Sequence, residues 1–199
     1  MTIPADGKIR SFIAIPVPES GIQALEDSVR GLEAEFGRHV RWVRPAGIHL
    51  TLKFMGDIQL GIAEKVLESL SSVTTVFKPF VLAINGLGVF PNLRSPRVLW
   101  AGLNGDLEVL GALQQAVDDA VGQLGLPKEQ RGFSPHLTLG RVRRDVNDEQ
   151  RRKISEAISS AAPPTAVEWT ADTANLMRTE LDPNGSKHYL VGSASLGTG

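Results

Sequence analysis

The sequence contains no cysteine. Disulfide bonds, cysteine-ligated zinc and thiol nucleophiles are therefore excluded. It also lacks any run of about 18 apolar residues, the length that a helix needs to cross a bilayer. The first residues show neither the basic segment nor the apolar segment of a secretory signal peptide. From these absences we expect a cytoplasmic protein that has no membrane partner.

An excess of charge of either sign is also missing. The 21 Lys and Arg residues and the 22 Asp and Glu residues give a formal net charge of −1. Proteins that wrap long nucleic acids present a broad basic surface, so any nucleic-acid contact here is expected to be small and local. With 42% hydrophobic residues over 199 positions, the chain has enough apolar side chains for a sizeable core. The composition predicts a globular protein that binds its ligand in a pocket.

What the sequence does contain is a repeated tetrapeptide. His-Leu-Thr-Leu occurs at residues 49–52 and again at 136–139. A hydrophobic, strand-like segment precedes each copy at the same spacing, at 12–15 and at 99–102. A helical pattern lies between segment and motif in both halves, and another helical pattern follows each motif. This similarity, offset by about 87 residues, predicts an internal duplication.

The order of the elements follows from hydrophobic periodicity and turn residues. Helix N-caps are expected near Ser20 and at Asn147, a loop between the halves at 88–97, and a final turn at 182–185. Besides the two motif strands, we expect strands at 10–17, 40–43, 80–87, 98–103, 167–178 and 187–195, and helices at about 22–36, 60–70, 107–124 and 147–162.

This mixture of strands and helices predicts an α+β fold. We expect one domain over 1–199, made of two pseudo-symmetric β-α-β lobes from the halves 8–87 and 98–195. The helices lie outside, and the motif strands line a central groove. Because side chains alternate along a strand, the first motif strand is expected to have two faces, a core face of Ile48, Leu50, Leu52 and Phe54 and a groove face of His49, Thr51, Lys53 and Met55.

Two histidines in one groove can carry out acid–base catalysis. An imidazole has a reference pKa near 6.5, so one ring can deprotonate a water while the other protonates a leaving oxygen. The hydroxyls of Thr51 and Thr138 can donate hydrogen bonds to non-bridging oxygens, which suits a phosphoester better than a carbonyl. Of the nearby cations, Arg141 is the stronger candidate to neutralise a phosphate and Lys53 the weaker.

Other interpretations of the histidines fit the sequence less well. Two amphipathic strands could carry His and Thr by chance, but the matched surroundings disfavour this. No Gly-x-Ser-x-Gly segment is present for a serine hydrolase. Each motif strand offers one good zinc ligand and no helically spaced partner, so neither a metal nor a cofactor is predicted. His39 and His188 have no repeated partner and are predicted to be surface or structural residues. The other aromatics are predicted to be mostly core, with one near the groove available to stack a nucleobase: Trp42, Trp100, Trp169, Phe133 and Tyr189.

The motifs and their flanks resemble the two-histidine (2H) phosphoesterases, and within them the RNA 2′,3′-cyclic phosphodiesterases once described as 2′-5′ RNA ligases. The matching segments are residues 10–16, 49–56, 98–102 and 133–141, with Tyr189 in the last strand. They span almost the whole chain. The resemblance implies a two-lobed α+β enzyme that opens 2′,3′-cyclic phosphates of RNA ends or small nucleotides to 2′-phosphomonoesters, without a metal or another cofactor. We expect it to be a monomer.

The resemblance also implies a role for each motif residue. His49 is the proton donor to the departing 3′ oxygen, and His136 is the base that activates water. Thr51 and Thr138 bind the phosphoryl oxygens, and Arg141 matches the basic position that follows the second motif. Three alternatives stay open: the same chemistry on another cyclic or 2′-5′-linked nucleotide, reversible 2′-5′ RNA ligation, and a non-catalytic module that holds an RNA end. Intact histidines in both motifs disfavour the last.

Overall fold

The computed structural model describes residues 7–182 and 185–197. The elements follow one another as β1 (Lys8–Pro16), α1 (Glu19–Phe36), β2 (Val40–Trp42), the 3-10 turn η1 (Pro45–Gly47), β3 (His49–Gln59), α2 (Leu60–Thr74), β4 (Phe80–Phe90), β5 (Val98–Gly105), α3 (Leu107–Gln123), β6 (Leu137–Val142), α4 (Asp148–Ser160), β7 (Glu168–Ala171), β8 (Thr173–Asp182) and β9 (Gly185–Ser195). The predicted α+β class is confirmed.

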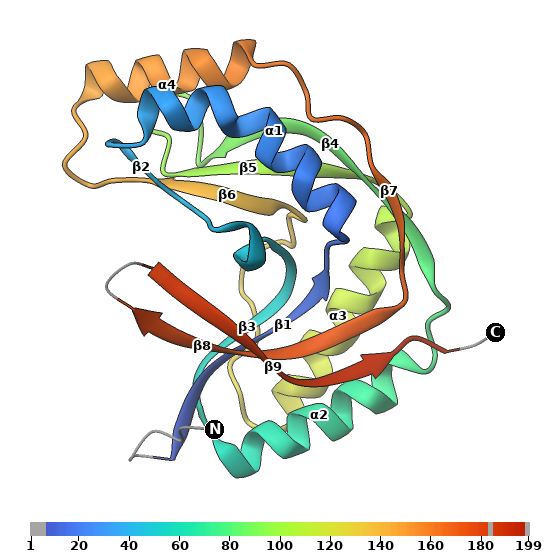
Figure 1. Ribbon diagram of the computed structural model, residues 1–199. Coiled ribbons are helices and arrows are strands. Elements are labelled where there is room, and N and C mark those ends of the chain that lie inside the picture. The colour runs from blue at the N-terminus through green and yellow to red at the C-terminus, as the bar shows by residue number, and fades with distance from the viewer. Residues whose placement is uncertain (1–6, 183–184, 198–199) are drawn as a thin grey trace.

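The strands form one curled antiparallel sheet in the order β7-β4-β5-β6-β3-β1-β8-β9, with β2 attached to β6. The motif strands β3 and β6 meet in its middle through a single register pair, Leu50 with Leu137. Around this junction the sheet bends into two parts, and helices cover the outside of each (Figure 1). Helices α2 and α3 pack together on the part that contains β3 and β9, while α1 and α4 lie on the part that contains β2 and β4.

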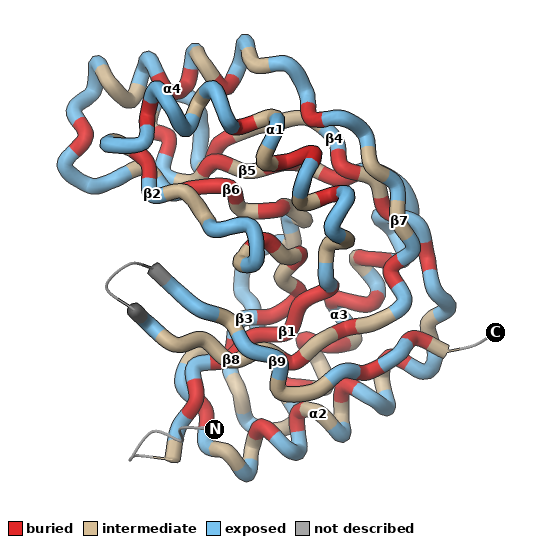
Figure 2. The backbone as a smooth tube through the Cα atoms, in the orientation of Figure 1, coloured by how far each residue is buried: buried red, intermediate tan, exposed pale blue. Residues whose placement is uncertain are grey.

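Each part of the sheet draws strands from both halves of the predicted repeat. Strand β4, from the first half, pairs with β5 of the second half. Strand β8, from the second half, pairs with β1 of the first. The buried residues lie mainly on strands and helix faces in the interior of both parts (Figure 2). They form a large cluster around Leu50 and Leu137 and a smaller one around Leu99 and Ile154.

Several predicted element boundaries shift in the structure. Helix α1 begins after Pro18, which serves as its N-cap without a side-chain hydrogen bond, so the cap expected near Ser20 is wrong. The cap at Asn147 is confirmed, because its side chain accepts from the Gln150 amide at 2.9 Å. The single strand predicted over 167–178 is interrupted at Asp172 and becomes β7 and β8, which pair with β4 and β1. The predicted turn at 182–185 includes two residues that lie outside the described part of the chain.

Strict alternation along the first motif strand ends at Leu52. Strand β1 pairs Ala14 with Thr51 but Ile13 with Lys53, so Leu52 is an extra residue in a β-bulge. A bulge reverses which face the following side chains occupy. Phe54 is therefore 63% exposed, whereas Lys53 and Met55 are buried. Both faces predicted beyond Leu52 are wrong for this reason.

The second motif strand has a bulge at the equivalent position. Trp100 of β5 pairs with Thr138, and Leu99 pairs with Gly140, which leaves Leu139 as the extra residue. Arg141 consequently shares a face with Thr138, as Phe54 does with Thr51. The repeat thus extends to the backbone irregularity that follows each threonine.

Candidate active site

The structure brings the two His-x-Thr motifs together at the centre of the sheet. His49 is the first residue of β3, and His136 immediately precedes β6. Around the antiparallel pair of Leu50 with Leu137, the register sets each histidine opposite the threonine of the other motif. The two leucines are fully buried, so the histidines and threonines share the opposite face. All four of these polar side chains are half-buried.

A backbone carbonyl two residues upstream orients each imidazole. Nδ1 of His136 lies 2.8 Å from the carbonyl oxygen of Ser134, and His49 donates a hydrogen bond to the backbone of Gly47. A carbonyl oxygen can only accept, so the bonded nitrogen of each ring carries hydrogen. In His136 this leaves Nε2 as the nitrogen that can exchange a proton with a ligand.

Phenylalanines hold the two rings in place. His49 stacks on Phe12 with 4.4 Å between ring centroids and 24° between planes. His136 makes an edge contact with Phe90 at 5.0 Å, and Phe90 also packs against Trp100. Neither phenylalanine was assigned to the site from the sequence, because each lies in a hydrophobic segment that is equally consistent with core packing.

A third histidine lies in the first half of the site. His188 of β9 contacts the His49 ring edge-on at 5.2 Å. Burial, and secondarily the charge that His188 can carry, lower the pKa of His49 to about 4. Burial also lowers the pKa of His188. In the free protein His49 is therefore neutral at pH 7.

The two cations considered from the sequence occupy different environments. Arg141 is exposed on the same face as Thr138 and lies opposite Arg41 of β2. Lys53 points to the other side of the sheet, is only 4% exposed, and forms an ion pair with Asp118 of α3. Its ammonium group also donates to the carbonyl of Pro127 at 2.6 Å. The bulge at Leu52 thus excludes Lys53 from the groove and makes it a core residue.

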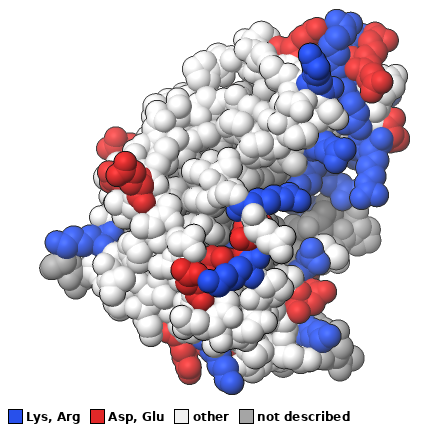
Figure 3. Space-filling view, turned by 180° about the vertical axis from the view of Figure 1, so that it is seen from behind, with Lys and Arg blue, Asp and Glu red and all other residues white. Residues whose placement is uncertain are grey.

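Basic side chains gather at one end of the molecule. Seen from behind, Lys and Arg are concentrated on the side that carries β2 and the start of α4 (Figure 3). Strands β2 and β6 and the segment after β6 carry four exposed arginines: Arg41, Arg141, Arg143 and Arg144. This concentration of charge is local, since the whole chain has a formal net charge of −1.

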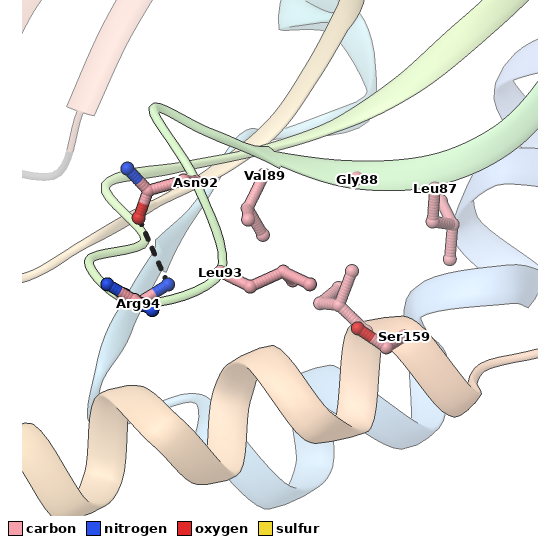
Figure 4. A pocket seen from close by; sticks show the side chains of 8 residues that line it. Leu87, Gly88, Val89, Asn92, Leu93, Arg94 and Ser159 are labelled. Atoms are coloured by element: carbon pink, nitrogen blue, oxygen red, sulfur yellow. Dashed lines mark hydrogen bonds between the residues drawn. The ribbon is translucent and has the colours of Figure 1, made fainter.

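Two cavities differ in their relation to the histidines. One of about 200 Å³ lies beside His49 and His188 and is also lined by Asn175 and Met177 of β8. A larger one of about 680 Å³ lies between β4, the loop after it and α4, and is lined mainly by apolar side chains such as Leu87 and Leu93 (Figure 4). The histidines do not line the larger cavity.

The described residues include no cluster of three or more His, Asp or Glu side chains arranged to hold a metal ion. In the same part of the chain, no helix is both long and apolar enough to span a membrane. The polar groups at the centre of the sheet are imidazoles, hydroxyls and a guanidinium. These groups can exchange protons with a ligand and donate hydrogen bonds to an anion.

Comparison with known proteins gives consistent matches over nearly the full chain. A family model described as LigT like Phosphoesterase matches residues 15–100 and 104–188. A protein of Methanothermobacter thermautotrophicus named RNA 2′,3′-cyclic phosphodiesterase is 31% identical over 89% of this chain and 94% of its own length. A protein of the same name from Archaeoglobus fulgidus is 35% identical over 75% of this chain and 83% of its own length.

Solved structures show the same fold. The crystal structure of a Thermus thermophilus protein superimposes with a TM-score of 0.78 at 26% identity, covering 94% of this chain and 98% of that one. The structure of E. coli LigT complexed with 3′-AMP gives a TM-score of 0.73 at 20% identity, covering 95% and 98% of the two chains.

Proposed function

The chain belongs to the LigT-like phosphoesterase family, and we propose that it is an enzyme that hydrolyses the 2′,3′-cyclic phosphate at the end of an RNA. The observation that carries this proposal is the pairing of two His-x-Thr strands at Leu50 and Leu137. This pairing sets two imidazoles and two hydroxyls around one point. The relatives named RNA 2′,3′-cyclic phosphodiesterase support the choice of substrate.

In the proposed reaction the two histidines have opposite tasks. His136 takes a proton from a water molecule, and the water oxygen attacks phosphorus. The bond between phosphorus and the 3′ oxygen breaks, and His49 gives that oxygen a proton. Thr51 and Thr138 donate hydrogen bonds to the non-bridging oxygens, where negative charge increases in the transition state. The product keeps its phosphate on the 2′ oxygen.

The environment of His49 places a condition on this assignment. With a pKa of about 4, the free imidazole carries no proton to donate at neutral pH. A phosphate anion bound beside it favours the charged ring and raises its pKa. We infer that His49 takes up a proton from solvent and becomes a proton donor only when the substrate binds. Because a general acid must be protonated to act, kcat/KM, which reports the free enzyme, should fall on its alkaline side according to the lowered pKa of His49.

The first test identifies the product and the metal requirement together. Nucleoside 2′,3′-cyclic phosphates incubated with the protein in excess EDTA should yield nucleoside 2′-phosphate at an undiminished rate, since the proposed groups need no Lewis acid. Chromatography against 2′- and 3′-phosphate standards distinguishes the products. A 3′-phosphate product would reverse the orientation of the ester between the histidines. Activity that returns only with Mg²⁺, Mn²⁺ or Zn²⁺ would contradict the two-histidine scheme.

The arginines near the site favour an oligonucleotide over a mononucleotide as substrate. Arg141 is the next residue after Thr138 whose side chain is on the groove face, because the bulge at Leu139 lies between them. Arg41 lies beside Arg141 on β2. Guanidinium groups bind phosphate through paired hydrogen bonds. We propose that Arg141 contacts the reacting phosphate and that Arg41 contacts a phosphate further along the RNA.

This arrangement predicts different effects for the two arginines. Arg141→Ala should lower kcat/KM by about 10- to 100-fold for every cyclic phosphate, the usual contribution of a hydrogen bond to a charged group. Arg41→Ala should impair only oligonucleotides that end in a cyclic phosphate and reduce the salt dependence of their binding by about 0.7 in slope.

Arg152→Ala provides the control for this prediction, because Arg152 pairs with Glu156 on the exposed side of α4. It should change neither value. Equal losses on mononucleotide and oligonucleotide in Arg41→Ala would contradict the assignment of that residue.

A further inference from the structure

The third histidine of the site is held by contacts that fix both its position and its orientation. His188 lies opposite Thr179 in the pairing of β8 with β9, and its Nδ1 is 3.0 Å from the Thr179 hydroxyl oxygen. Its ring meets the rings of Phe12 and His49 edge-on, at 5.1 Å and 5.2 Å between centroids and 85° in both cases. A half-exposed ring with one hydrogen bond and two aromatic contacts is restricted to one orientation.

The same ring lies beside the turn that orients His49. A β-carbon added to Gly47 would lie 3.6 Å from Cδ2 of His188, which is van der Waals distance. Gly47 is also the residue whose backbone accepts the hydrogen bond of His49. His188 therefore contacts the reacting imidazole and lies beside the turn that orients it.

We propose that His188 is a positioning residue of this active site, whose ring holds His49 between Phe12 and the Gly47 carbonyl. This proposal rests on the proposed function. Without the ring of His188, one side of His49 opens to the cavity of about 200 Å³ and the imidazole can turn away from the groove. Small displacements of a reacting group cost much of its rate, on the order of 10²-fold for 1 Å.

His188 also limits the charge that this part of the site can hold. The groups that face the pair are the ring of Phe12 from β1, the Gly47 carbonyl from η1 and, around His188, Thr179, Asn175 and Met177 from β8. All of these groups are uncharged, so the titratable group that faces the His49 ring is His188, and the one that faces His188 is His49. Two cationic rings at 5.2 Å repel each other in a partly desolvated site. A proton taken up from solvent when the anionic substrate binds is therefore held by one ring of the pair.

The sequence around β9 shows why this residue belongs to the groove. Tyr189, the neighbouring residue, lies on the opposite face of the strand, where Arg178 covers its ring at 4.4 Å. The resemblance seen in the sequence matched Tyr189 in this last strand, but the residue that contacts the reacting histidine is His188. Tyr189 consequently provides a control that is adjacent in sequence and remote from His49.

The experiment compares His188→Ala, His188→Phe and Tyr189→Phe in the full chain. His188→Ala should lower kcat on a nucleoside 2′,3′-cyclic phosphate by about 10- to 100-fold with KM changed less than about twofold, because positioning affects the reaction more than substrate binding. His188→Phe keeps an edge-on ring and should restore most of kcat. In both variants the alkaline limb of kcat/KM should move to higher pH, since the charge opposing protonation of His49 is gone. Tyr189→Phe should behave as the wild type.

A titration of the His49 ring protons by NMR gives a second readout that does not need turnover. The pKa of His49 should rise in both His188 variants and stay unchanged in Tyr189→Phe. An unchanged kcat in a folded His188→Ala, or a change confined to KM, would overturn the positioning role. A wild type that does not hydrolyse the ester would instead refute the proposed function, and the NMR titration would still show whether His188 acts on His49.

Discussion

Replacing His49 or His136 lowers the turnover of a nucleoside 2′,3′-cyclic phosphate by about 10²- to 10⁴-fold, the usual contribution of one general acid or base. Each variant loses one of the two proton transfers, while the threonines and the other histidine still bind the phosphate. The loss should fall mainly on kcat. We expect His49→Ala and His136→Ala to differ little, because the pseudo-symmetric strands give each ring one transfer to perform.

Steady-state kinetics at saturating substrate tests this expectation, with thermal unfolding as the check on folding. Because the His49 ring is stacked on Phe12, His49→Ala leaves a gap beside Phe12. His49→Gln fills more of this space and is therefore measured alongside the alanine variant. His39→Ala is the matched control, since His39 lies just before β2 and forms no part of the paired motifs. Near-normal kcat in a folded variant of either motif histidine would remove that residue from the mechanism.

Lys53→Met is expected to destabilise the fold by about 3–5 kcal/mol, the cost of leaving one member of a buried ion pair without its partner. Lys53 and Asp118 are 3% and 7% exposed in their side chains. The Asp118 carboxylate also accepts a hydrogen bond from the backbone amide of Glu129. Unfolding by urea, followed by circular dichroism, measures the change in free energy.

Two further variants separate the ion pair from other effects of the substitution. Lys53→Met combined with Asp118→Asn should recover most of the lost stability, because the amide is neutral and its oxygen still accepts from Glu129. Asp119 is the neighbour of Asp118 on α3, and its ion pair with Lys128 is exposed. Lys128→Met removes this exposed pair and should change the free energy of unfolding little. A fully stable Lys53→Met with reduced activity would show that Lys53 serves the groove after all.

Local pattern was sufficient for the centre of the site. His49 shares a face with Thr51, and His136 with Thr138, because alternation over three consecutive strand residues depends only on the local backbone. The N-cap at Asn147 was predictable for the same reason, since it involves residues within one helical turn. The duplication was visible because both copies kept the same four residues and similar flanks.

The rest depended on partners distant in the chain. Whether a strand contains a bulge is decided by the hydrogen bonds of its neighbours, so the reversal at Leu52 that buries Lys53 and exposes Phe54 could not be read from the motif. The position of His188 depends on the pairing of β8 with β9 and on the way these strands return beside β1. The sequence by itself determined which chemical groups the protein possesses and that each motif presents its histidine and threonine on one face, because those facts lie in short repeated segments. The pairing of β3 with β6 then brings the two motifs together. Only the tertiary structure decided which cation reaches the groove and which third imidazole supports His49, because those contacts join residues that are far apart in the chain.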